Sequence, residues 1–290
     1  MKMNFKLAAA ALVGLSMAAC SSNQKSEPLT EVNWATFNIR YDNPDDLQNN
    51  WQYRKDSVAK FIHANDLDVV GMQEVLHNQM EDLKQRLPEY TAVGVGRDDG
   101  NTAGEYAPLF FKKDRFEVLD SNTFWLSQYP DSIGFIGWDG ACCRIATWAK
   151  LKDKENGKIF MAVNTHFDHV GVEARREGAL LIMKRIQEIV GDRPAVLTGD
   201  FNVTDNSDAY TTLTTNKFVF KDAYKESIEK KGASYTFHDF GKIPDNECEK
   251  IDFIFVTPQI KVGSSFIPKE PDTETGFLSD HNPQVTSLSF

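Results

Sequence analysis

Apolar residues along this chain form two kinds of run, short continuous runs and longer runs with helical spacing. The short runs are rich in β-branched and aromatic residues and predict strands; they cover residues 32–39, 67–74, 107–111, 144–151, 158–166, 194–200 and 250–256. Apolar residues spaced three and four apart predict helices over 51–65, 77–87 and 172–190. Because strands and helices mix throughout the chain, the pattern predicts an α+β (layered α/β) fold with helix-covered sheets.

Several predicted strands end in a polar residue that is able to do chemistry. These residues are Asn38, Glu74, His166 and Asp200. Asp252 interrupts the apolar run at 250–256, and Asp280 precedes His281 just before the last strand. Ligands bind at the carboxyl ends of strands in open α/β sheets. The repeated polar endings therefore predict a functional site along one rim of the sheets.

The stretch "AVLTGDFN" at 195–202 admits two interpretations. An isolated Asp-x-Asn sequence is usually a strand end followed by an Asx turn. In an extended segment, however, Asp200 and Asn202 would point to the same side, with Phe201 anchored behind them. The polar endings of the other strands favour a shared site for the two side chains.

The N-terminus has the pattern of an export signal. Residues 1–19 carry two lysines, then an apolar run that is too short to span a bilayer, and Cys20 follows small residues as in a bacterial lipoprotein. We expect 1–19 to be a lipoprotein signal peptide, 20–31 a polar tether and 32–290 the folded domain. The only expected membrane contact is a lipid anchor on Cys20, in the periplasm or on the surface of a Gram-negative bacterium.

Charge and cysteine content bear on nucleic-acid binding, disulfides and zinc sites. The formal net charge is −10, and it becomes −12 without residues 1–19, which hold two lysines and no acids. An acidic protein gains little from neutralising phosphates, so a nucleic-acid partner is unfavourable. Cys142, Cys143 and Cys248 have neither a disulfide framework nor zinc-site spacing. A single bridge from Cys142 or Cys143 to Cys248 stays open.

The polar strand ends supply oxygen ligands for a metal ion. Glu74, Asp200 and Asp280 offer carboxylates, and Asn38 and Asn202 offer neutral oxygens. Hard oxygen donors suit Mg²⁺ or Mn²⁺. Two histidines could donate hydrogen bonds to a phosphoryl oxygen, and each needs an acceptor that fixes its tautomer. Glu105 and Asp252 are the candidates for His166 and His281.

Seven motifs together resemble the endonuclease/exonuclease/phosphatase superfamily, which includes deoxyribonuclease I. In chain order they are "FNIRYD", "GMQEV", "GEYAPLFF", "NTHFDH", "LTGDFN", "KIDFIFV" and "SDHNP". The resemblance covers 32–290. It implies a DNase I-like four-layer sandwich of two mixed sheets, packed face to face and flanked by helices.

The resemblance also implies a role for each matching residue. Glu74 would be the main metal ligand, supported by Asn38 and Asp280, and Asp200 would orient or deprotonate the attacking water. Asn202 would contact the phosphoryl oxygens. His281 held by Asp252, and His166 held by Glu105, would stabilise the transition state. The implied reaction is in-line attack of water on a phosphoester.

Substrate selection is expected to come from residues around this site. The candidates for substrate binding are Arg144, Arg40, Tyr106, Trp138, Asp168 and His169. They favour a small phosphorylated sugar or glycan phosphate, acted on by a monomer. A secreted nuclease, a sphingomyelinase-like phosphodiesterase and a non-catalytic surface binding lipoprotein are the alternatives.

Overall fold

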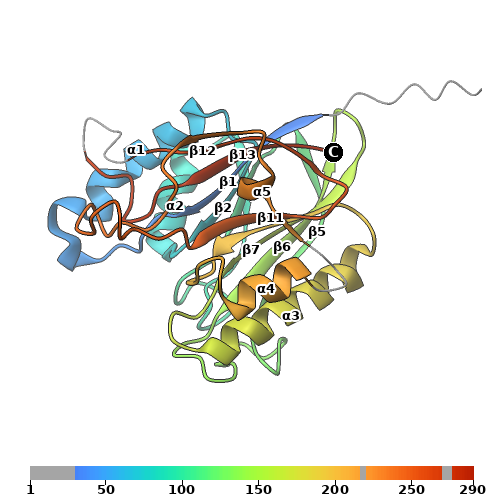
Figure 1. Ribbon diagram of the computed structural model, residues 1–290, viewed down its shortest axis with the longest axis horizontal. Coiled ribbons are helices and arrows are strands. Elements are labelled where there is room, and N and C mark those ends of the chain that lie inside the picture. The colour runs from blue at the N-terminus through green and yellow to red at the C-terminus, as the bar shows by residue number, and fades with distance from the viewer. Residues whose placement is uncertain (1–29, 216–219, 270–275) are drawn as a thin grey trace, which may run out of the picture.

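Two mixed β-sheets pack face to face in the computed structural model, which describes residues 30–215, 220–269 and 276–290 (Figure 1). In spatial order, the seven-stranded sheet contains β10 (Glu229–Gly232), β12 (Lys261–Ile267), β13 (Gln284–Ser289), β1 (Glu31–Asn38), β2 (Val69–Gln73), β4 (Leu109–Lys112) and β3 (Tyr90–Val93). The six-stranded sheet contains β5 (Phe116–Trp125), β6 (Ile145–Asp153), β7 (Ile159–His166), β8 (Ala195–Asp200), β11 (Asp252–Val256) and β9 (Lys221–Asp222).

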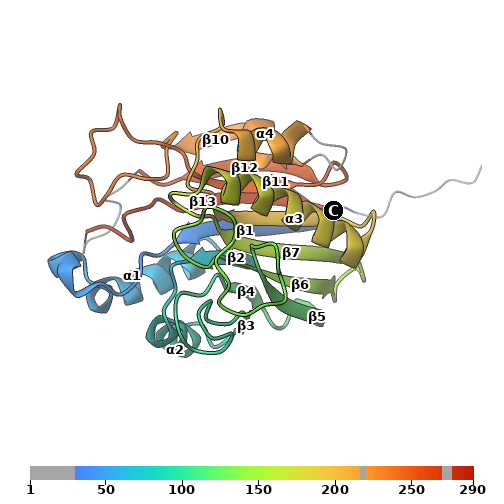
Figure 2. The same ribbon diagram turned by 90° about the horizontal axis from the view of Figure 1, so that it is seen from below.

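Helices cover the outer faces of both sheets. Against the seven-stranded sheet pack α1 (Trp51–Ala64) and α2 (His77–Arg86), whereas α3 (Val172–Val190) and α4 (Asp208–Thr215) pack against the six-stranded sheet (Figure 2). A 3₁₀ helix (Pro44–Asn49) precedes α1, and the short α5 (Ala223–Glu226) follows β9. The result is the predicted four-layer sandwich, and this prediction of the fold is confirmed.

The apolar core lies in three layers that match this arrangement. Between the sheets, Trp34 and Phe111 of the seven-stranded sheet meet Phe160 and Ile254 of the six-stranded sheet. Separate apolar clusters lie beneath each helical layer. Strands that are buried on both faces have continuous apolar sequences, and this explains why these strands were predicted from the sequence.

The predicted helices and the apolar strands are present with small shifts at their ends. The helix predicted at 77–87 ends at Arg86, just before Pro88. Its first turn is fastened by Gln79, whose side chain accepts a hydrogen bond from the backbone N–H of Leu76. Elements without an apolar run were not predicted, namely β3, β5, β9, β10, β12, α4 and α5.

Strand register places the polar strand ends at one rim. In the six-stranded sheet, Asp200 of β8 lies directly opposite His166 of parallel β7 and Asp252 of antiparallel β11. Residues directly opposite each other point to the same face of a sheet. In the seven-stranded sheet, β1 and β2 run parallel, so Asn38 and Glu74 leave their strands at the same end.

A polar contact joins the two sheets beneath this rim. Asn164 of β7 is fully buried, and its Nδ2 atom donates to the backbone oxygens of Met72 (2.6 Å) and Pro108 (3.0 Å). Its Oδ1 atom accepts from Gln73 Nε2 (2.7 Å) and Thr198 Oγ1 (3.0 Å). Gly71 allows this close approach, since a Cβ atom there would lie 2.2 Å from Thr198 Oγ1.

The predicted signal peptide, Cys20 and nearly all of the tether lie outside the described residues. Within the described ranges, no helix is both long enough and apolar enough to cross a bilayer. Cys142, Cys143 and Cys248 are all free thiols, so none of the bridges left open by the sequence forms here.

Candidate active site

His281 and Asp252 form a buried pair at the centre of the rim. The Nδ1 atom of His281 lies 2.8 Å from Asp252 Oδ2. Burial alone would lower the pKa of His281, but Asp252, Asp200 and Asp280 outweigh it and raise that pKa to about 10. The ring is therefore a cation at neutral pH. Its other nitrogen, Nε2, lies 3.8 Å from Asp200 Oδ2, so its N–H is aimed toward the rim.

Asp200 is buried among other charged groups at the end of β8. Burial, reinforced by the charge of Asp252, raises its pKa to about 7. Its Oδ2 atom accepts a hydrogen bond from Asn38 Nδ2 (2.9 Å), and its Oδ1 atom accepts from the backbone N–H of Asn202 (2.9 Å). A carboxylate with this pKa can exchange a proton near neutral pH.

Glu74 is held in place by its backbone and by two donors. It has a positive φ of 61°, which is uncommon for a residue with a side chain and is typical of functional sites. Its carboxylate accepts from Asn38 Nδ2 (3.0 Å) and from the backbone N–H of Tyr41 (3.1 Å). Asn38 therefore bridges Glu74 and Asp200 through its amide nitrogen.

The predicted metal ligands are only partly brought together. Ligand atoms of Glu74, Asp200 and His281 lie within 4.8 Å of one another. Glu74 and Asp200 supply the hard oxygen donors of this group, whereas the Nδ1 atom of His281 is already engaged by Asp252. The Oδ1 atom of Asn38 accepts from the backbone N–H of Arg40 (3.0 Å), and this orients its amide nitrogen, rather than its oxygen, toward Glu74 and Asp200.

Arg40 lies between Glu74 and Asp280. Its Nη1 atom is 4.0 Å from Glu74 Oε2 and 3.6 Å from Asp280 Oδ2, and its Nε atom is 3.0 Å from Asp46. Burial, partly opposed by His281, raises the pKa of Asp280. Carboxylates that share one cation form an acidic site whose oxygens suit a hard divalent metal.

His166 is fixed from the opposite side of Asp200. The Nδ2 atom of Asn202 donates to the backbone oxygen of Phe167 (2.9 Å) and to His166 Nε2 (3.0 Å), so Nε2 is an acceptor and Nδ1 carries the proton. Burial and the nearby charges of Arg144 and Arg97 hold the pKa of His166 well below its usual value. The ring is neutral, in contrast to His281.

The backbone of the Asp-x-Asn stretch follows the Asx-turn interpretation and is not extended at Asn202, but the two side chains share a site as the other interpretation expected. Asn202 has a positive φ of 50° and closes an Asx turn onto Asp200, while its side chain still reaches the site. Phe201 is buried behind them in edge-to-face contact with Phe167 and Phe255, as predicted.

Glu105 does not hydrogen-bond His166 as predicted. Its Oε2 atom is 3.7 Å from His166 Nδ1, which has no hydrogen-bond partner among the described residues. Instead, both carboxylate oxygens of Glu105 accept from Arg97, at 2.7 Å and 3.0 Å. A bidentate pair with a guanidinium is the stronger interaction, and it engages both carboxylate oxygens of Glu105.

Arg144 is a buried guanidinium beside this cluster. Its Nη2 atom donates to His169 Nδ1 (3.1 Å), and it lies within 4.0 Å of Glu105 and Asp168. Its Nε and Nη1 atoms have no hydrogen-bond partner among the described residues. Unsatisfied buried donors are costly, so they mark a place where an anionic group would be stabilising.

Asp168, one of the candidates for substrate binding, is held by backbone N–H groups of two loops. Its carboxylate accepts from the backbone N–H groups of Ala141, Cys142, Val170 and Gly171. Burial opposes the charge, but these hydrogen bonds lower the pKa of Asp168 to about 2. Asp168 therefore fastens the loop before β6 to the loop after β7.

Tyr106, another candidate for substrate binding, is hydrogen-bonded within the protein. The hydroxyl of Tyr106 donates to the backbone oxygen of Asn101 (2.8 Å) and lies 3.1 Å from His77 Nδ1. Asp139 accepts from the backbone N–H of Ala174 (2.7 Å) in the first turn of α3, so it caps that helix. Trp138 is half-buried with a positive φ of 48°.

Two arginines of the site were missed as functional candidates. Arg97 holds Glu105, and Arg54 is buried beneath the rim, where its Nη1 atom donates to the backbone oxygens of Ile39 and Leu278, both at 2.7 Å. Burial lowers the pKa of Arg54 to about 10. The helical pattern around Arg54 did not indicate that this residue is buried, since exposed and buried arginines of a helix look alike in sequence.

The sandwich with its acidic, histidine-containing rim has the arrangement that the seven sequence motifs implied. The sequence pattern of the Endonuclease/Exonuclease/phosphatase family matches residues 35–281, and this chain belongs to that family. This confirms the resemblance seen in the seven motifs. Members of the family are phosphoesterases, nucleases or phosphatases, typically dependent on a divalent metal.

Solved structures and curated proteins resemble the chain to different degrees. An endonuclease/exonuclease/phosphatase from Bacteroides vulgatus is 69% identical, with a TM-score of 0.88 over 89% of this chain and 98% of that one. A mannosyl-6-phosphatase from Bacteroides thetaiotaomicron is 33% identical, with a TM-score of 0.83 over 89% and 100%. Nocturnin from Drosophila melanogaster is 22% identical over 245 residues, covering 72% of this chain and 36% of nocturnin. The chain spans 34% to 49% of the length of the curated relatives it matches.

Proposed function

We propose that the chain is an exported, Mg²⁺-dependent hydrolase that removes phosphate from a small phosphorylated sugar or glycan phosphate. The observation that carries the hydrolytic part is the convergence of Glu74, Asp200 and His281 within 4.8 Å, with His281 held by Asp252. This set combines a metal-binding carboxylate, a group able to take a proton and a cation. Those are the components that hydrolysis of a phosphoester needs.

The residues divide the chemistry between them. Glu74, with Asp280 nearby, would hold the metal, and a bound divalent ion would neutralise phosphoryl charge and activate water. Asp200 accepts a proton from the attacking water as the water oxygen bonds to phosphorus. The bond from phosphorus to the sugar oxygen breaks, and that oxygen leaves with the bonding electrons and takes up a proton from solvent. The His281 cation donates a hydrogen bond to a phosphoryl oxygen, whose negative charge grows in the transition state.

Two observations support a sugar phosphate over a polynucleotide. The mannosyl-6-phosphatase of Bacteroides thetaiotaomicron aligns along its whole length with this chain. The Nε and Nη1 atoms of Arg144 make no hydrogen bond among the described residues, although Glu105 and Asp168 lie within 4.0 Å, so they can donate to one phosphate. Arg40 and Arg97 at the same rim already donate hydrogen bonds to carboxylates. A strand of nucleic acid requires a row of free cations.

The decisive experiment is phosphate release from a panel of substrates. The panel includes mannose 6-phosphate, other hexose phosphates, phosphodiesters, single-stranded and duplex nucleic acid and sphingomyelin, each with Mg²⁺ and with EDTA. We expect Mg²⁺-dependent release from a sugar phosphate with the highest kcat/KM. Exclusive turnover of nucleic acid or sphingomyelin would contradict the substrate class, and no turnover of any member would favour a binding protein.

Export and anchoring form a separate part of the proposal. It is supported by the signal-like residues 1–19 and by Cys20, which follows small residues. Metabolic labelling with palmitate in a Gram-negative host tests it. We expect label in the wild-type protein and none in Cys20→Ala, which should fractionate as a soluble species.

A further inference from the structure

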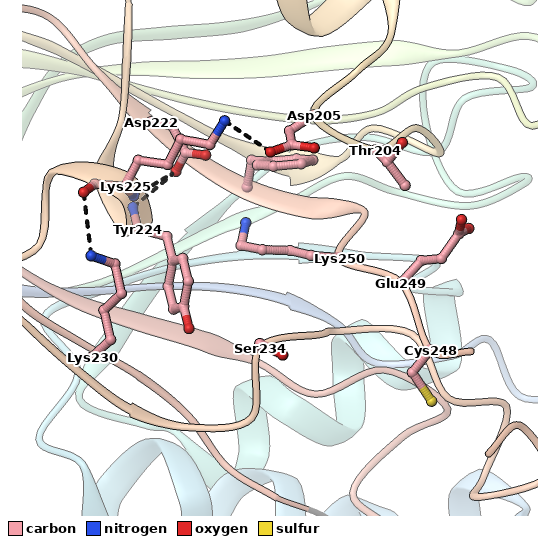
Figure 3. Close-up of a pocket in the computed structure, with 11 residues that line it drawn as sticks. Thr204, Asp205, Asp222, Tyr224, Lys225, Lys230, Ser234, Cys248, Glu249 and Lys250 are labelled. Carbon is pink, nitrogen blue, oxygen red and sulfur yellow. Dashed lines mark hydrogen bonds and ion pairs between the residues drawn. The ribbon is translucent and has the colours of Figure 1, made fainter. Parts of the chain in front are cut away.

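A cavity lined in part by lysines lies near the active site. It has a volume of about 510 Å³ and is formed by α5, the segment after Asn202 and the residues that lead into β11 (Figure 3). Its lining includes three lysines (Lys225, Lys230 and Lys250) together with Tyr224, Thr204 and Phe253. None of these residues belongs to the catalytic cluster described above.

Lys250 is the central cation of this cavity. Its ammonium group donates one hydrogen bond, to the backbone oxygen of Asp252 (2.6 Å), and lies 3.6 Å from the centroid of the Phe253 ring. Within the described residues, no carboxylate lies within ion-pairing distance of Lys250 or Lys230, whereas Lys225 pairs with Asp205 at 2.8 Å. Burial lowers the pKa of Lys250 to about 8, which reflects the cost of keeping this ammonium desolvated.

None of the acidic residues of the lining forms an ion pair with Lys250, although the charges of Asp222 and Asp205 partly oppose the effect of burial on its pKa. Asp222 accepts from the Tyr210 hydroxyl (3.1 Å) and from the backbone N–H groups at the start of α5. Asp205 is occupied by Lys225, and the Glu249 carboxylate is directed away from Lys250 (Figure 3). An anion in the cavity would therefore supply the partner that the protein itself does not.

We propose that this cavity is a second anion site, which binds a tetrahedral oxyanion of the phosphate class through the ammonium group of Lys250. Such an ion offers several acceptors to the donors that Lys250 does not use internally. The hydroxyl-bearing residues Thr204 and Ser234 also line the cavity, and they suit the oxygens of the same ligand.

The position of the cavity links it to the reaction centre. The backbone of Phe237 forms isolated bridges with Glu249, which lines the cavity, and with His281. Because paired backbones lie about 4.8 Å apart, the backbones of Glu249 and His281 are separated by roughly 10 Å. Lys250 also holds the backbone oxygen of Asp252, the residue whose side chain positions His281.

Binding of inorganic phosphate to EDTA-treated protein tests the proposal without any turnover. The readout is the shift of backbone amide signals around Lys250 in NMR spectra, since phosphate at the catalytic rim shifts other signals. We expect Lys250→Met to weaken binding about ten- to hundredfold, in line with loss of a charge-assisted hydrogen bond. Lys250→Arg should retain binding, and the exposed control Lys242→Met should match wild type.

A crystal soaked with selenate gives a direct view of the same site. We expect an anomalous selenium peak within hydrogen-bonding distance of Lys250 Nζ in the wild type and none in Lys250→Met. Equal phosphate affinity in the wild type and in a folded Lys250→Met variant, or no binding at millimolar phosphate, would overturn the proposal. Unfolding temperatures of the variants establish that they are folded.

The anion can be free phosphate or a second phosphate on the substrate, and kinetics separate these sources. This arm rests on the proposed function, whereas the binding arm does not. If the anion belongs to the substrate, Lys250→Met raises KM for a sugar bisphosphate but not for the monophosphate. If it is free phosphate, the variant loses the effect of added phosphate on rate while both KM values stay unchanged.

Discussion

The imidazole of His281 and the carboxylate of Asp252 are 2.8 Å apart and both almost completely buried. Such a contact orients the ring and favours its charged form. We expect Asp252→Asn to lower kcat by about 10²–10⁴-fold with little change in KM, because positioned acid–base groups contribute in that range. Steady-state kinetics on the substrate found in the panel measure this.

A double variant tests whether the two residues act as one unit. Asp252→Asn combined with His281→Ala should be scarcely slower than His281→Ala alone, because the carboxylate acts through the ring. If the two losses multiply, the residues work independently, and the pairing has no catalytic meaning.

The titration of His281 gives a second prediction. Its pKa of about 10 lies above the ordinary value of 6.5, so the folded state binds the proton more tightly than the unfolded state. This contribution to stability is complete below pH 6.5 and is lost as the pH rises toward 10. In EDTA-treated protein, ¹⁵N spectra of the imidazole should show a charged ring at pH 8. A neutral ring at pH 8 in the wild type would contradict this, and Asp252→Asn should produce one.

Metal dependence gives a third prediction. EDTA should abolish activity, and Mg²⁺ or Mn²⁺ should restore it. Glu74→Ala should remove nearly all turnover at ordinary Mg²⁺ because it deletes the principal carboxylate. Isothermal titration of Mg²⁺ into both proteins is the direct measurement, with Glu81→Ala on the exposed face of α2 as the control. Unchanged Mg²⁺ affinity in Glu74→Ala would remove Glu74 from the metal site.

Asn164 gives a prediction about stability. All four of its hydrogen bonds are buried between the sheets, so Asn164→Ala leaves two carbonyl groups, the Gln73 amide and the Thr198 hydroxyl each without one partner. We expect a loss of about 3 kcal/mol or more in the free energy of unfolding, because each orphaned buried group costs about 1–3 kcal/mol. Urea unfolding measures this, with the exposed Asn122→Ala as reference. A loss equal to that of Asn122→Ala would mean that water replaces the Asn164 amide.

The sequence predicted the parts of the fold that apolar runs define. Strand β8 is buried on both faces and therefore appears as a continuous apolar run. Helix α3 is buried on one side and therefore shows apolar residues at helical spacing. Strand β5 was missed because Glu117 to Asp120, in its first half, are exposed and include only two apolar residues. A strand held by pairing with a neighbour, here β6, leaves little trace in its own sequence.

The site was predictable where a single strand end carries the chemistry. Asp200 and His166 could be placed because each terminates an apolar run. The partner of Glu105 could not be predicted, since Arg97 and Glu105 sit in one irregular segment whose closure depends on backbone hydrogen bonds such as Arg97 N–H to Glu105 O. The sequence contains more than one carboxylate that could pair with each histidine, and only the three-dimensional structure shows which one does.

The choice between a sugar phosphate and duplex DNA gives the last prediction. Duplex DNA presents closely spaced phosphates, so an enzyme that tracks it needs several unpaired cations along a groove. At this rim, Arg40 donates hydrogen bonds to Asp46 and Arg97 to Glu105. The Nε and Nη1 atoms of Arg144 make only longer ion-pair contacts, at 3.7 Å and 4.0 Å, and no hydrogen bond among the described residues. We expect Arg144→Ala to raise KM for the sugar phosphate about ten- to hundredfold through loss of a charge-assisted contact, with a smaller change in kcat. The matched control Arg176→Ala, on the exposed face of α3, should leave both constants unchanged. Duplex DNA should be cut weakly or not at all at physiological salt, and efficient plasmid nicking by the wild type without phosphate release from any sugar phosphate would refute this substrate class.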